Sequence, residues 1–140
     1  MKYVIVYWTR FGNNKRIVDY LAGKLQGEVQ VFKTDEVNPA SMPDADYYVF
    51  SAAAEKFSIQ KDMRKLMGAL ENMNNKKYGI INTHASKSNK WLVKMGKVLD
   101  KKGMVKAAEV DFQIVGGMND QSTIVDGWEA KLDEFCAKLQ

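Results

Sequence analysis

Residues 3–16 read YVIVYWTRFGNNKR and give the clearest indication of how the chain folds. An apolar run of strand length ends at Thr9, and a short polar loop with one glycine follows. Residues on one helical face come next, namely Ile17, Val18, Leu21, Ala22 and Leu25. A strand that turns directly into a helix directs unpaired backbone N–H groups and the positive end of the helix dipole at one spot.

The loop between this strand and this helix has the residue types of a phosphate-binding site. Thr9, Asn13 and Asn14 supply side-chain donors, and Gly12 lacks the Cβ that would keep an oxygen-rich group away. The alternative is an ordinary turn in which Thr9 or Asn13 caps the helix. One cap residue would suffice for that purpose, so the surplus of polar residues favours a phosphate monoester.

Composition fits a globular protein. The chain has 140 residues, of which 46% are hydrophobic and 27% are charged, and a chain of this length buries a sizeable core. We therefore expect a single domain over residues 1–140. One cysteine, Cys136, and one histidine, His84, exclude an intramolecular disulfide and a metal site built from several cysteines or histidines.

Charge and hydropathy predict the surroundings of the protein. The first apolar run is too short for a signal-peptide core or a membrane span, so we expect a cytoplasmic protein without a membrane segment. The net charge is +4, and the lysines are scattered along the sequence. This pattern favours acidic partners over nucleic acid.

The alternation of strand and helix continues along the chain. Apolar runs predict further strands over residues 28–33, 47–52, 78–83 and 105–115. Helical spacing predicts a helix carrying Met63, Leu66, Met67, Leu70 and Met73, another over 91–99 and a last one over 124–139. Residues 34–46 contain two prolines and are expected to form a loop.

This order of elements predicts an α/β fold. Five strands separated by helices form a three-layer α/β/α sandwich, and a phosphate loop after the first strand is typical of a parallel sheet of order 2-1-3-4-5. In such a sheet the ligand binds where the first and third strands diverge. The sequence has no repeated Gly-x-Gly-x-x-Gly, which argues against a dinucleotide-binding fold.

Residues 9–15, TRFGNNK, resemble the phosphate-binding loop of the flavodoxins, commonly Ser/Thr-x-x-Gly-Asn-Thr. The order and length of the elements resemble a short-chain flavodoxin over essentially the whole chain. The resemblance implies one flavin mononucleotide (FMN), bound noncovalently, and a role as an electron carrier. It implies that the phosphate is held by Thr9, Arg10, Phe11, Gly12, Asn13 and Asn14. Asn14 replaces the family's second hydroxyl with an amide, which can still donate.

The resemblance also implies two loops beside the flavin ring. One follows the third strand and contains Ala53, Ala54 and Phe57, of which the alanines let the backbone approach a flat ring and Phe57 could stack on it. The other follows the fourth strand and contains Thr83, His84 and Ala85. His84 or Trp91 could cover the second face of the ring, although the helical position of Trp91 favours packing in the core.

The charges of these loops depart from the family. Acidic flavodoxins surround the flavin with carboxylates, whereas here Lys56, Lys87 and Lys90 accompany the single acid Glu55. A cation stabilises the anionic reduced flavin by about 1 kcal/mol at about 4 Å in water. We therefore expect a hydroquinone couple less negative than that of acidic carriers, and negatively charged redox partners such as ferredoxins or acidic reductases.

Two alternatives to an electron carrier remain. One is a small FMN-dependent oxidoreductase that reduces a quinone or resembles the menaquinone-linked protoporphyrinogen oxidases, but those have a long insertion near the fifth strand, for which residues 105–117 leave no room. The other is a binding domain that keeps the fold without flavin. A phospho-acceptor receiver is excluded, because Ser51 stands where that class needs an aspartate at the end of the third strand.

Overall fold

A parallel sheet forms the centre of the molecule. The computed structural model describes residues 1–55, 58–85, 90–117 and 119–140. In the described residues the parallel strands run in the order β2 (Glu28–Lys33), β1 (Lys2–Tyr7), β3 (Tyr47–Glu55), β5 (Lys77–His84) and β6 (Val105–Val115). Once the short strand β4 is set aside, this is the predicted order 2-1-3-4-5, which is confirmed.

Two short antiparallel strands extend this sheet, and the sequence predicted neither of them. β4 (Ser58–Ile59) folds back on the end of β3, and β7 (Thr123–Ile124) folds back on the end of β6. Ile124 was expected in the last helix and lies in β7 instead. Strands of two residues carry no periodicity, so only their pairing with a longer strand defines them.

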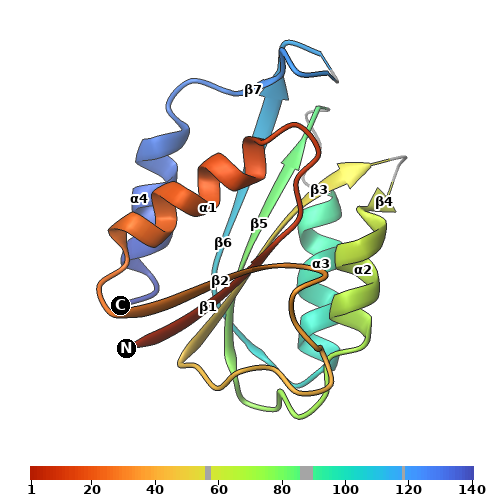
Figure 1. The fold of residues 1–140 in the computed structure, drawn as a ribbon, viewed down its shortest axis with the longest axis vertical. Helices are drawn as coiled ribbons and strands as arrows, with labels where there is room; N and C mark the ends of the chain where they lie inside the picture. The colour runs from red at the N-terminus through yellow and green to blue at the C-terminus, as the bar shows by residue number, and fades with distance from the viewer. Residues whose placement is uncertain (56–57, 86–89, 118) are drawn as a thin grey trace.

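Helices cover both faces of the sheet, as the three-layer prediction requires (Figure 1). α1 (Asn13–Lys24) and α4 (Trp128–Ala137) pack on one face, where Ile5, Val49 and Ile81 form part of the core. α2 (Lys61–Gly68) and α3 (Lys90–Lys101) pack on the other face, against Tyr48, Phe50 and Ile80. Successive residues of β3 and β5 therefore alternate between two cores, which explains their continuous apolar sequence.

The predicted apolar stripe after β3 is only partly helical. α2 ends at Gly68, yet Leu70 and Met73 beyond it are buried in the same core as Met63 and Met67. The sequence thus predicted the burial of these residues correctly and the length of the helix incorrectly, because a turn also places apolar side chains toward the sheet.

The connection from β2 to β3 has no helix or strand. Residues 34–46 form turns without a helix, as Pro39 and Pro43 predicted.

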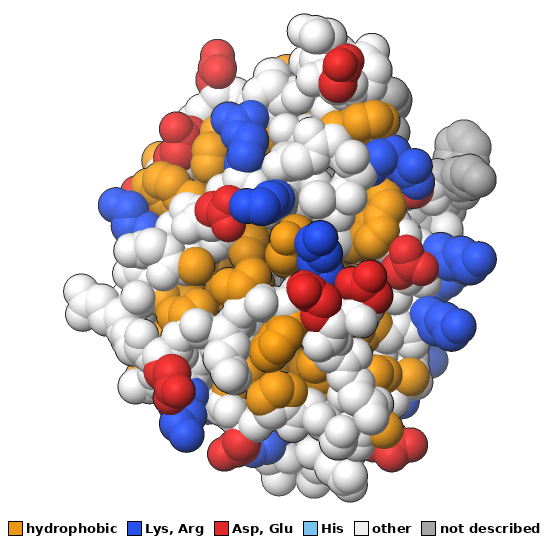
Figure 2. All heavy atoms as spheres, viewed as in Figure 1, with side chains coloured by type: hydrophobic (Ala, Val, Ile, Leu, Met, Phe, Trp, Pro, Cys, Tyr) orange, Lys and Arg blue, Asp and Glu red, His pale blue; other side chains and the backbone are white. Residues whose placement is uncertain are grey.

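Acidic and basic side chains are interspersed on the face drawn in Figure 2. None of the described helices combines the length and the apolar character needed to cross a membrane.

Candidate functional site

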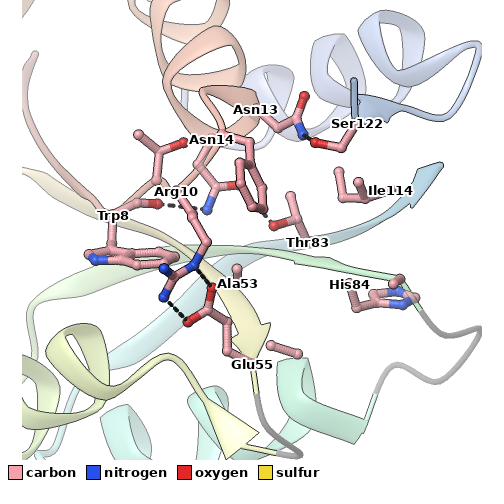
Figure 3. A pocket seen from close by; sticks show the side chains of 14 residues that line it. Trp8, Arg10, Asn13, Asn14, Ala53, Glu55, Thr83, His84, Ile114 and Ser122 are labelled. Atoms are coloured by element: carbon pink, nitrogen blue, oxygen red, sulfur yellow. Dashed lines mark hydrogen bonds and ion pairs between the residues drawn. The ribbon is translucent and has the colours of Figure 1, made fainter. Parts of the chain in front are cut away.

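A cavity opens at the carboxyl ends of β1, β3 and β5 (Figure 3). From this edge the chain leaves β1 for α1 on one face and β3 for α2 on the other, which makes it the switch point where ligands bind in open α/β sheets. Of the twelve predicted site residues, the cavity wall contains Thr9, Arg10, Phe11, Asn13, Asn14, Ala53, Ala54, Thr83, His84 and Ala85. Gly12 lies in the same loop, and Phe57 lies outside the described residues.

Gly12 gives the loop after β1 its shape. It is the residue before α1 and has φ of 91°, in the left-handed region that favours glycine. A Cβ built on Gly12 would meet no atom within 4 Å, so the space beside this residue is open. No side chain caps α1, and the Thr9 hydroxyl instead accepts the Gly12 N–H at 3.0 Å. The structure therefore does not support the alternative that Thr9 or Asn13 caps the helix.

The backbone of this loop offers several unused donors. The backbone N–H groups of Arg10, Phe11, Asn13 and Asn14 find no acceptor within the described part of the chain. The hydroxyl proton of Thr9 is also available, because its oxygen acts only as an acceptor for Gly12. Converging free N–H groups at the start of a helix form a binding site for an anion. A phosphate monoester fits this donor set.

The side chains of Asn13 and Asn14 connect the loop to the rest of the site. Asn14 Nδ2 donates to the carbonyl of Trp8 at 2.8 Å, and its Oδ1 accepts the Thr83 hydroxyl at 3.0 Å. Asn13 Nδ2 donates to Ser122 Oγ at 3.0 Å. Each amide therefore uses one N–H to hold neighbouring elements together and keeps one for other contacts.

An ion pair joins the loop to the end of β3. Arg10 Nε and Nη2 donate to the two carboxylate oxygens of Glu55 at 2.6 and 2.9 Å, and its guanidinium lies 5.2 Å from the centre of the Trp8 ring. Figure 3 shows Arg10 reaching from the loop to Glu55 beside Trp8. The hydrogen bonds that Arg10 donates to Glu55 raise the pKa of Arg10. Within the described residues, the charge of Glu55 is therefore paired with that of Arg10.

The structure describes only part of the predicted flavin-flanking loop that follows β5. Lys90 and Lys94 of α3 lie 5.0 and 4.7 Å from the centre of the Trp91 ring. Trp91 is half-buried and packs against the core beneath α2 and α3, as predicted. Lys56 and Lys87, which the charge argument included, lie outside the described residues.

Four residues of the cavity wall were not among the predicted site residues, namely Trp8, Glu55, Ile114 and Ser122, although Glu55 was expected in the loop beside the flavin ring. Trp8 and Glu55 are direct neighbours of predicted residues, so their position at a strand end was an available signal. Ile114 and Ser122 come from β6 and from the segment before β7. Ser122 contacts Asn13 across 109 positions of sequence, and no local pattern indicates such a contact.

Comparison with solved structures defines the fold. A flavodoxin from Streptococcus pneumoniae TIGR4 matches with a TM-score of 0.81 at 20% identity, over 99% of this chain and 97% of that chain. The fold is that of the flavodoxins. Flavodoxin 1 from Bacillus cereus, in its oxidised form, matches with a TM-score of 0.76 at 17% identity, over 99% and 97% of the two chains.

The flavodoxin fold of this chain also matches part of a longer protein. Rubredoxin oxygen:oxidoreductase from the anaerobe Desulfovibrio gigas gives a TM-score of 0.74 at 14% identity, over 99% of this chain and 36% of that chain. No family model and no curated protein matches the sequence. The resemblance noted in residues 9–15 therefore agrees with the fold, while the identity to these solved structures is only 14–20%.

Proposed function

We propose that this protein binds FMN noncovalently in the cavity at the ends of β1, β3 and β5, and that it carries electrons between redox partner proteins. The unpartnered N–H groups around Gly12 are the observation on which the proposal rests. They belong to the loop and the first turn of α1, next to the open space at Gly12, and in this proposal a phosphate dianion satisfies them together. The flavodoxin fold places this loop at the switch point of the sheet.

The chain's own residues have separate tasks in this proposal. The loop amides and the Thr9 hydroxyl bind the monoester. The small side chains of Ala53 and Ala54 leave room for a flat ring beside the end of β3. FMN supplies the one- and two-electron chemistry when bound, and the protein sets its orientation and its electrostatic surroundings.

The charge of the protein supports a class of partner. The net charge is +4, which attracts acidic proteins such as ferredoxins or acidic reductases and speeds their association at low salt. We propose that the protein works in the cytoplasm and that its reduced flavin is more stable than in acidic flavodoxins. A redox titration of the flavin-loaded protein checks the second point, and a couple as negative as that of acidic flavodoxins would contradict it.

The oxidoreductase alternative has less support. The structure connects β6 to β7 through residues 116–122 alone, which leaves no insertion near the fifth parallel strand. A flavin-loaded protein that turns over a quinone or a porphyrinogen at a steady rate would favour this alternative over the electron carrier.

The phosphate supplies the sharpest test of the proposal. Apoprotein is titrated with FMN and with riboflavin, which has the same ring and no phosphate, while flavin fluorescence is recorded. Two hydrogen bonds to a charged phosphate contribute about 3 kcal/mol or more, so we expect FMN to bind about 100-fold more tightly than riboflavin. Equal affinities for FMN and riboflavin would refute the assignment of the loop after β1 as the phosphate site. Binding of neither ligand would identify a flavin-free domain.

A further inference from the structure

The outer face of α3 carries a row of lysines. Lys90, Lys94, Lys97 and Lys101 are all exposed, and they follow one another at spacings of four, three and four residues. Residues three and four apart are neighbours on a helix surface, so the four side chains form one stripe. At a rise of about 1.5 Å per residue the stripe is about 16 Å long. We call these four residues the lysine row.

The lysine row points away from the sheet. Leu92, Met95 and Leu99 of the same helix are buried in the core, which leaves the lysines on the solvent side. Val93 follows Lys90 by three residues and is 46% exposed. The outer face of α3 is therefore basic, with one apolar side chain at its edge.

The other long helices mix charges where α3 does not. On α1, Lys15 and Asp19 form an ion pair at 2.7 Å. On α4, Lys131 lies between Glu129 and Asp133 in the sequence. Alternating charges of this kind are typical of a face that meets only solvent, so the single sign of the lysine row calls for another explanation.

The acid of α3 does not neutralise the row. Asp100, the one acid of this helix, accepts the Tyr78 hydroxyl at 2.8 Å. Within the described residues, no ion pair involves Lys94, Lys97 or Lys101. Like charges three and four residues apart destabilise a helix. The row therefore costs the free protein stability, and a docked surface of opposite charge would remove this repulsion.

The row begins at the end of the sheet that holds the cavity. α3 follows β5, whose last residue, His84, lines the cavity. Because β5 and β6 are parallel, the helix between them starts at this end of the sheet and runs away from it (Figure 1). A partner lying along α3 would therefore reach the edge of the sheet where we place the flavin.

We propose that the lysine row is the docking surface for an acidic protein, whose Asp and Glu carboxylates pair with the lysines. The inference rests on the proposed function, under which this acidic protein is the redox partner. Electron-transfer complexes are transient and bury less than about 1,200 Å² in total, so the face of one helix and its surroundings form a sufficient contact. Opposite charges on the two surfaces speed their encounter and fix its orientation.

Two other anionic surfaces fit the row less well. Binding of single-stranded nucleic acid combines cations with aromatic rings on which the bases stack. Trp91 is half-buried, and Nζ of Lys90 and of Lys94 lie 5.0 and 4.7 Å from the centre of its ring, so the ring is already in use. A helix that binds a membrane surface inserts its apolar face, whereas the apolar face of α3 is buried in the core.

A matched pair of triple variants tests where the docking surface lies. Each variant replaces three exposed lysines by glutamine and lowers the net charge from +4 to +1. The row variant combines Lys94→Gln, Lys97→Gln and Lys101→Gln. The control variant combines Lys24→Gln, Lys131→Gln and Lys138→Gln, which lie on or next to α1 and α4.

The probe is an acidic plant-type ferredoxin that carries a fluorescent label, mixed with each protein in a stopped-flow instrument. At about 10 mM salt we expect the row variant to associate at least about 10-fold more slowly than the unaltered protein, and the control variant less than about 3-fold more slowly. At about 0.5 M salt the three proteins should associate at the same rate, because salt screens the charges.

Three results would overturn the inference. Equal slowing in the two variants would show that only the net charge matters. A rate that neither variant changes would show that the row has no part in docking. In the third result, the row variant loses binding to duplex DNA or to phosphatidylserine vesicles while its association with ferredoxin is unchanged, which would assign the row to another anionic surface.

Thermal unfolding checks the fold of both variants. The row variant should melt no lower than the unaltered protein, because it has lost like-charge pairs. If the triple variant does not fold, Lys97→Gln alone replaces it, with an expected slowing of about 2-fold at low salt and an unchanged rate as the contrary result.

Failure of this inference is distinct from failure of the proposed function. Lys94, Lys97 and Lys101 are not among the residues that line the cavity, so FMN affinity should be the same in the row variant and the unaltered protein. If FMN does not bind the unaltered protein, the proposed function fails. If FMN binds and ferredoxin associates equally fast with both variants, only the docking surface fails.

Discussion

Substitution of Gly12 by alanine tests both the conformation and the chemistry of the loop. At φ of 91° an L-residue is strained, and the new Cβ meets no atom of the protein within 4 Å. The cost to the folded state is therefore backbone strain alone, about 1–2 kcal/mol. With an unfolding entropy of about 2.1 cal/mol/K per residue, the melting temperature should fall by about 3–7 °C.

In the proposed complex the same methyl group would occupy the open space beside Gly12 in which we place the phosphate. A phosphate displaced from one of these donors loses about 1.5–3 kcal/mol, which weakens FMN binding by about 10- to 150-fold. Fluorescence titration measures the affinity, and thermal unfolding of the apoprotein measures the strain. Gly12→Val should lower both the melting temperature and the FMN affinity further than Gly12→Ala, since a β-branched residue tolerates positive φ least.

Gly127 provides the matched control. It also precedes a helix, has φ of 86° and would accept a Cβ without a contact within 4 Å, but it does not line the cavity. Gly127→Ala should lower the melting temperature as much as Gly12→Ala and leave FMN affinity unchanged. Gly23→Ala, on the exposed side of α1, should instead stabilise by about 0.5–1 kcal/mol. Equal FMN affinity in the Gly12 and Gly127 variants would refute the phosphate assignment.

Three further predictions concern the framework of the site and the core. Asn14→Ala removes the nearer acceptor of the buried Thr83 hydroxyl, at 3.0 Å, and leaves only the Ala52 carbonyl at 3.5 Å. The variant should cost about 1–3 kcal/mol in urea unfolding, and a loss below about 0.5 kcal/mol would count against this bridge. Burial, and then the bond to Asp100, raise the pKa of Tyr78 above the ordinary value of 10.0. The contribution of the Tyr78 hydroxyl to the free energy of unfolding is therefore full below pH 10 and lost as the pH rises further. Between about pH 9 and 11, unfolding midpoints should therefore fall less steeply with pH in Tyr78→Phe than in the unaltered protein. Parallel pH profiles of the two proteins would contradict this. Burial raises the pKa of the Cys136 thiol, so a disulfide reagent should react far more slowly with the folded protein than with the urea-unfolded chain, and equal rates would refute its burial.

Local patterns predicted the parts of the fold that local physics determines. The apolar run before Thr9 has to be a strand, and the short loop after it can only lead into α1, so the first strand–helix unit was readable from residues 3–16. The order of the parallel strands followed because helices between strands restrict how a sheet can be wound. The open space at Gly12 was predicted for the same reason, since a missing Cβ is a property of one residue, whereas its positive φ was not predicted.

Contacts between distant segments were not predictable in this way. The hydrogen bond of Asn13 to Ser122 depends on where β7 pairs with β6, and a two-residue strand has no pattern to predict it. The contact of His84 with Asp111 depends on the register between β5 and β6, which shifts at Tyr78/Gly79. One-residue changes of register reverse the direction of every side chain, so sequence alone could not place this carboxylate against the imidazole.

The bond between Asn13 and Ser122 also bears on how the protein is made. On a ribosome the amide is synthesised early and its hydroxyl partner more than a hundred residues later. A nascent chain of which only the first half has left the ribosome lacks one wall of the pocket. Closing so long a segment carries an entropic cost that only the packed sheet offsets. In the proposed function, capture of the flavin would then mark the completion of folding, and a yellow colour in freshly translated protein would report chains that have reached their native state.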